Sequence, residues 1–211
     1  MIKLAILITY LILVNVLFAH GVVIEGDFDG RIAIGYEEAV EVIPDLDNVR
    51  FTILADGSEY CYTTWRTVML GRAIVGIEVY LSENFQARCI YHELGHVYML
   101  RLYGYRADKL PDIQGVQWNR VITWQTTPEM ALVEGWACYI ETLINGQHTP
   151  PLEITGWPNY TIPHHVSTTL YSMDADRLWT LIGSIRPQTM RELAGRYNNG
   201  RIPMVWGKYR R

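Results

Sequence analysis

His92-Glu93-Leu94-Gly95-His96 is the stretch that decides the fold of this chain. It lies within residues 83–102, a segment without proline whose apolar residues recur at helical spacing. Ser82 is the expected N-cap of this helix, and Gly104 is its expected end. Residues four apart lie on one face of a helix, so both imidazoles face the same side.

Two histidines at this spacing on a helix are typical ligands of a zinc ion. Glu93 directly follows the first histidine, so its carboxylate can reach a water at the ion without binding the ion. The motif therefore predicts a hydrolytic centre in which His92 and His96 hold one Zn²⁺ and Glu93 is the general base. The alternative is a core helix whose histidines and glutamate are paired with other side chains.

A catalytic zinc needs a third protein ligand. Positions three and six after His96 are Met99 and Leu102, which excludes the peptidases that continue the motif with glycine and a third histidine. The ligand must therefore come from another part of the chain.

A second helix supplies the candidate. Thr127 is its expected cap, Pro128 its first turn and Gly146 its end. Glu134 lies mid-helix among apolar residues, where a carboxylate is costly to bury unless it binds metal or a cation. We expect Glu134 to be the third ligand, with Glu129 as the fallback. A buried salt bridge is the alternative role for Glu134.

The chain thus resembles the gluzincins, the thermolysin-like clan of metallopeptidases. The similar residues are His92, Glu93, His96 and the segment 134–137, which looks like the E-G-x-A form of the third-ligand segment. The resemblance covers roughly residues 75–145. It implies zinc-dependent hydrolysis of a peptide or protein substrate. In that clan an aspartate four residues after the ligand glutamate braces the first histidine, but here that position is Cys138.

The oxyanion of such a reaction needs a donor besides zinc. Thermolysin-like enzymes place such groups downstream of the second helix. The candidates at similar positions are Tyr160, His164, His165 and Tyr171. The alternative is a surface histidine pair and packed tyrosines.

The expected fold is α+β and zincin-like. A small mixed or antiparallel N-terminal sheet, about residues 30–82, leads into the motif helix and a helical half, about residues 83–200. Residues 20–211 form one expected domain. The expected strands are 48–55, 59–68 and 73–81, with a turn at Asp56-Gly57; further helices are 37–42, 172–185 and 187–198, and 147–166 is a loop. By analogy with the resembled clan, strand 73–81 borders the cleft, where an extended peptide could pair with its edge.

The N-terminus predicts export. One lysine precedes an apolar run over residues 4–19, which is typical of a secretory signal cleaved after Ala19. Without cleavage the run continues through Ile24 and is long enough to anchor the chain in a bilayer. We therefore expect residues 1–19 to be a signal peptide or an anchor. The protein would be secreted, or associated with the membrane through residues 4–24 with its catalytic domain outside the cytoplasm.

The chain has three cysteines. Cys89 lies one turn before His92, and Cys138 lies one turn after Glu134. In an antiparallel helix pair these two fall toward the same end, so they form either a disulfide or two small core residues.

Two other functions fit parts of the sequence. One is a non-catalytic zinc-binding exported protein. The other is a copper monooxygenase with His20 as its mature N-terminus and His148, His164 or His165 as a second ligand. The net charge of −4 gives no indication of nucleic acid binding, and nothing in the sequence indicates the oligomeric state.

Overall fold

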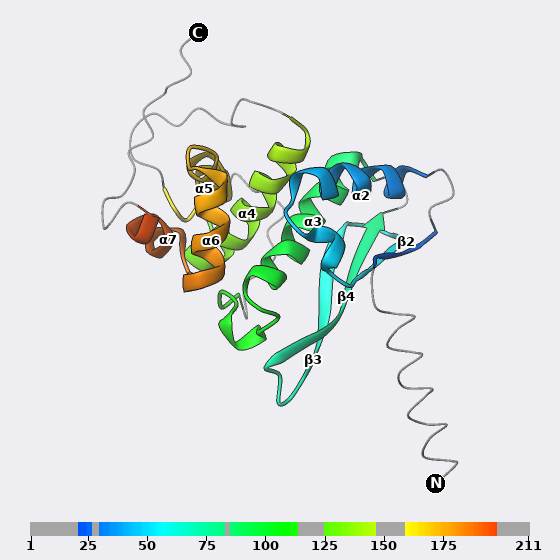
Figure 1. Ribbon diagram of the computed structural model, residues 1–211, viewed down its shortest axis with the longest axis horizontal. Helices are drawn as coiled ribbons and strands as arrows, with labels where there is room; N and C mark the ends of the chain where they lie inside the picture. Colours follow the sequence, from blue (N-terminus) through cyan, green and yellow to red (C-terminus); the bar gives the residue numbers. More distant parts are fainter. Residues whose placement is uncertain (1–20, 27–29, 83–84, 114–124, 147–158, 198–211) are drawn as a thin grey trace.

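The computed structural model describes residues 21–26, 30–82, 85–113, 125–146 and 159–197 (Figure 1). The expected signal or anchor, residues 1–19, lies outside this part, and so do His20 and His148. In the part of the chain that is described, no helix combines the length and the apolar character needed to cross a membrane.

The sheet has four strands in the order β1-β2-β4-β3. Strands β1 (Val23–Glu25), β2 (Thr52–Ser58) and β4 (Ala73–Ser82) run parallel, and β3 (Tyr62–Val68) pairs antiparallel with β4. The sheet is therefore mixed. The expectation that β4 offers an open edge is wrong, because β4 is paired on both sides. Among the described residues, the edge strands are β1 and β3.

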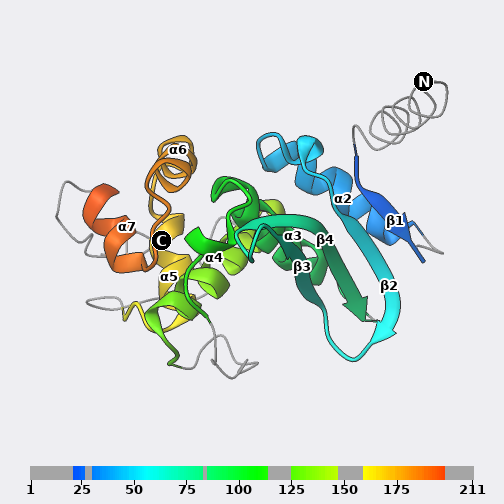
Figure 2. The same cartoon turned by 90° about the horizontal axis from the view of Figure 1, so that it is seen from below.

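Among the described helices, α2 and α3 lie beside the sheet, and α4, α5, α6 and α7 lie together farther from it (Figures 1 and 2). Helix α3 lies between the sheet and α4, and α5 packs on the other side of α4. The helices are α2 (Arg31–Val42), α3 (Ala87–Leu102), α4 (Pro128–Ile144), α5 (Pro163–Tyr171), α6 (Ala175–Ile185) and α7 (Met190–Tyr197), with short 3-10 turns at Leu46–Asn48 and Ala107–Lys109.

Several local signals were interpreted correctly. The Thr127 hydroxyl caps α4 by accepting a hydrogen bond from the Met130 amide at 3.2 Å, and Pro128 opens the helix. Gly104 and Gly146 follow the ends of α3 and α4 with φ of +67° and +61°, which only glycine adopts readily. Both boundaries were predictable because they rest on local backbone chemistry.

Other boundaries differ from the expectation. Helix α3 begins at Ala87 with Gln86 as its cap, not with Ser82, because β4 extends through Ser82. Asp56-Gly57 does not end a strand but lies inside β2, where the register with β4 shifts. Helix α5 occupies part of the expected loop, with Pro163 in its first turn. The short strand β1 was not expected.

Two glycines let the site helices approach closely. A Cβ atom on Gly95 would lie 2.8 Å from the Cα of Ala137, so α3 and α4 almost touch there. The fully buried Trp136 donates a hydrogen bond from Nε1 to the Gly95 carbonyl at 3.0 Å and fixes the same crossing. A Cβ on Gly135 would lie 2.5 Å from the Cβ of Val166, so α5 is held equally close to α4. This packing brings the polar faces of α3 and α4 together.

Candidate metal centre

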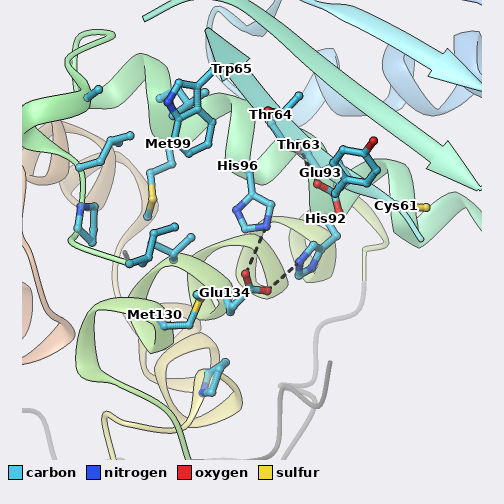
Figure 3. A pocket seen from close by; sticks show the side chains of 18 of the residues that line it. Cys61, Thr63, Thr64, Trp65, His92, Glu93, His96, Met99, Met130 and Glu134 are labelled. Atoms are coloured by element: carbon cyan, nitrogen blue, oxygen red, sulfur yellow. Dashed lines mark hydrogen bonds and ion pairs between the residues drawn. The ribbon is translucent and has the colours of Figure 1, made fainter. Parts of the chain in front are cut away.

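His92 and His96 on α3 face Glu134 on α4 (Figure 3). The Nε2 atom of His92 is 3.3 Å from Oε2 of Glu134, and the Nε2 atom of His96 is 3.8 Å from Oε1. Nitrogen and oxygen ligands about 2.0–2.2 Å from a tetrahedral zinc lie about 3.4 Å from one another. The spacing of these three groups therefore suits one zinc ion.

The Glu134 carboxylate gives independent support for a cation-binding role. Its Oε1 atom is buried and has no hydrogen-bond partner among the described residues. A buried carboxylate oxygen without a donor is costly. Two imidazole nitrogens and this oxygen form the donor set that a catalytic zinc uses, so the residues present fit that ion.

The protonation states of two ligands favour metal binding. Burial lowers the pKa of His96 and outweighs the neighbouring carboxylates, so its ring is neutral near pH 7. Burial alone would raise the pKa of Glu134, but contact with His92 and His96 holds that pKa below its usual value. Burial would also lower the pKa of His92, but Cys138, Glu134 and Glu141 together raise it well above its usual value. A zinc ion would replace that proton as the cation between these groups.

A hydrogen bond from the sheet holds the side chain of Glu93. Its side chain is buried, and Thr63 on β3 donates a hydrogen bond from Oγ1 to Glu93 Oε2 at 2.7 Å. The same hydroxyl lies 3.2 Å from the backbone carbonyl of Glu93. The carboxylate lines the same cleft as the three candidate ligands. Sequence reasoning missed Thr63, because its role depends on which strand lies beside α3.

The other nitrogen of His92 faces a second set of side chains. Its Nδ1 atom lies 3.5 Å from Oε2 of Glu141 and 3.9 Å from the sulfur of Cys138. Glu141 is seven residues after Glu134, so both carboxylates lie on one face of α4. Glu141, one turn beyond Cys138, therefore lies where a group that braces His92 would be needed.

A Glu141→Gln variant is expected to bind zinc about 10–100-fold more weakly, because groups that orient a metal-binding histidine usually contribute that much. Zinc affinity in a chelator competition measures the effect. Cys138→Ala is the matched control and should change affinity less, because its sulfur contact at 3.9 Å is weak. Equal losses in the two variants would assign the bracing role to neither residue alone.

The hypothesis of a disulfide between Cys89 and Cys138 is wrong. Cys89 pairs with Cys61, at the start of the β3 edge, with their Cα atoms 6.5 Å apart, and Cys138 is a buried free cysteine. Cys89 faces β3, whereas the sulfur of Cys138 turns toward His92. The bond ties β3 to the first turn of α3, and therefore steadies Thr63 beside Glu93.

Removing this disulfide is expected to destabilise the protein by about 3.5 kcal/mol, from the loop entropy of a 28-residue separation. Denaturant unfolding of Cys61→Ser measures the loss. Cys138→Ala keeps the bond and should unfold closer to the parent. Intact mass after alkylation of the unfolded, unreduced chain should show one free thiol; three free thiols would contradict the pairing.

The four oxyanion candidates do not line this cleft. Tyr160 is buried, and Tyr171 ends α5 half-buried. Both ring nitrogens of His164 are buried without a hydrogen-bond partner among the described residues, and burial lowers its pKa. His165 accepts a hydrogen bond from the Asn159 amide at 2.9 Å on Nδ1. The structure therefore lends no support to an oxyanion role for any of the four. Glu129, the fallback ligand, lies in the first turn of α4 and is also absent from the lining of the cleft.

The cleft measures about 1580 Å³ and runs along the free edge of β3. That volume exceeds the 300–1,000 Å³ typical of small-molecule pockets. Its walls come from β3, α3, the turn at Ala107–Lys109 and the face of α4 that carries Met130, Glu134 and Glu141. No family model, curated protein or solved structure matches the chain, so function must be inferred from this geometry.

Proposed function

We propose that the protein is a zinc-dependent peptidase of the gluzincin type, with His92, His96 and Glu134 as ligands. The observation that carries this proposal is the buried Glu134 oxygen without a hydrogen bond, facing two histidines in an open cleft. A structural zinc site is closed by four protein ligands, whereas three ligands beside a general base are typical of catalysis. This favours an enzyme over a non-catalytic zinc-binding protein.

Zinc, when bound, would lower the pKa of a water to about 7 and polarise the substrate carbonyl. Glu93 would accept a proton from the attacking water and then deliver it to the leaving amine. Thr63 would keep one oxygen of Glu93 occupied and so aim the other at the water. Glu141 would hold His92 in the orientation that presents Nε2 to the ion.

The substrate would bind as an extended peptide along β3. One edge of β3 is paired with β4, and its other edge lines the cleft. A peptide can add to such an edge through main-chain hydrogen bonds, with its side chains in flanking pockets. The Cys61–Cys89 bond supports an exported protein, because disulfides persist in oxidising compartments.

Metal removal tests the proposal. A chelator is expected to abolish hydrolysis of a mixed peptide library, and added zinc should restore it. Magnesium should not restore it, because histidine-rich sites favour zinc over magnesium. Hydrolysis that continues in the zinc-free protein would refute the proposed chemistry.

A further inference from the structure

The turn between β3 and β4 exposes large apolar side chains. We define Val68, Met69, Leu70 and Gly71 as the hairpin tip. Leu70 is 99% exposed, Met69 77% and Val68 44%. The hairpin projects beyond the helices that cover the rest of the sheet (Figure 1). These side chains therefore contribute almost nothing to the core.

The backbone of the tip suits other residues better. Met69 and Leu70 have φ of +55° and +57°, and the turn is closed by a hydrogen bond from the Arg72 amide to the Val68 carbonyl at 3.1 Å. Asparagine and glycine are favoured in such a hairpin turn, whereas large side chains are strained at positive φ. The hairpin turn accounts for the positive φ, but packing does not account for two large exposed apolar side chains at these positions.

The charge around the tip favours an anionic surface. The chain carries a net charge of −4, yet no acidic residue occurs between Cys61 and Ile77. Arg66 on β3 and Arg72 directly before β4 flank the tip. Arg72 is exposed, and Arg66 is 75% exposed with Glu78 at 3.7 Å as its ion-pair partner. An apolar turn between two arginines is complementary to anionic lipid headgroups.

The direction of the strands places the tip at the end of the sheet where β1 begins. Because β1, β2 and β4 are parallel, Val23 lies level with Thr52, and Thr52 lies level with Glu78. Ala73 precedes Glu78 by five residues, so the hairpin extends about 16 Å past the level of Val23. The chain therefore enters β1 from the end toward which the tip projects. The sequence leading into β1 contains the apolar run at residues 4–19.

We propose that the hairpin tip docks on an anionic lipid bilayer. Met69, Leu70 and Val68 insert among the headgroups, while Arg66 and Arg72 contact the phosphates. Thr67 and Gly71 also line the cleft, so this contact holds one end of the cleft at the bilayer surface. The proposal is independent of the chemistry at the metal centre.

Depth-dependent fluorescence quenching tests it on the full chain reconstituted into vesicles of equal parts phosphatidylcholine and phosphatidylglycerol. Leu70→Cys carries an environment-sensitive fluorophore at the tip. Glu59→Cys carries the same fluorophore at an exposed position beyond the opposite end of β3. Nitroxide lipids labelled near the headgroup are expected to quench the fluorophore at position 70 and leave that at position 59 unquenched. Replacing Arg66 and Arg72 with Gln should reduce the ratio of inserted to free tip about fivefold for each arginine.

Three results would overturn the proposal. One is an unquenched fluorophore at position 70 that stays open to aqueous iodide. Another is equal lipid quenching at positions 59 and 70, which would mean that the chain lies on the bilayer without a preferred contact. The third is a fluorophore at position 70 that is shielded from iodide but not quenched by lipid, which would assign the tip to a protein partner or a second copy.

Discussion

A Glu93→Gln variant is expected to retain zinc and to hydrolyse peptides at least about a hundredfold more slowly, the lower bound for loss of a general base. Glutamine has nearly the same shape, and its carbonyl oxygen can accept the Thr63 hydrogen bond at 2.7 Å. The buried surroundings of this side chain should therefore remain intact. What the amide cannot do is take a proton from the attacking water.

Zinc content and kcat measured on one preparation check this expectation. Thr63→Val is the graded comparison, because it keeps the carboxylate and removes only the hydroxyl that holds it. It should lower kcat less than Glu93→Gln, and Thr63→Ser should restore kcat by returning the hydroxyl. Full activity in Glu93→Gln would show that Glu93 is not the base, whatever the metal content.

The parts of the site that follow from local patterns were predictable. The spacing of His92 and His96 on a helix, and the cap and proline that start α4, need only the chain within one or two turns. Glu134 was chosen because a carboxylate among apolar residues needs a cation, and the structure places it 3.3 Å from His92. The burial of the Glu134 side chain was predictable, because the apolar residues around it in the sequence of the helix indicate it.

The residues that were missed depend on how elements cross. Glu141 contacts His92 because Gly95 and Ala137 let α3 and α4 run antiparallel at very short distance. A spacing of seven from Glu134 was visible in the sequence and could have indicated the shared face. Thr63 gave no such signal, since β3 also carries Thr64 and Thr67 and nothing in the sequence distinguishes the three.

Strand order explains the remaining errors. The expectation placed the cleft beside residues 73–81 because that strand precedes the motif helix. In the structure β2 and β3 lie on either side of β4, so consecutive strands β2 and β3 are not neighbours. The same order brings Cys61, directly before the edge strand β3, to Cys89. The expected pairing of Cys89 with Cys138 considered only the two helices. Tertiary pairing of strands far apart in sequence decides both points, and periodicity carries no information on it.

Glu134→Ala is expected to lose zinc almost completely under conditions where the parent holds one ion per chain. The variant removes one of three protein ligands, so the loss should exceed the roughly 10–100-fold expected for the bracing partner Glu141. It removes the buried Oε1 atom that lacks a hydrogen bond, but it also removes the ion pair between Oε2 and Nε2 of His92 at 3.3 Å. Because the folded state holds the pKa of Glu134 below its usual value, the metal-free variant should melt below the metal-free parent near pH 7.

Glu129→Ala is the matched control on the same helix. Glu129 lies in the first turn of α4, where a negative charge favours the helix dipole, and it does not line the cleft. Its loss should lower stability by about 0.3–1 kcal/mol and leave zinc bound. Metal analysis after dialysis against a weak chelator compares the three proteins directly. Zinc retained in Glu134→Ala and lost in Glu129→Ala would transfer the ligand role to Glu129. Zinc retained in both would require a third ligand from another segment, and the cleft geometry would then no longer support the proposed peptidase.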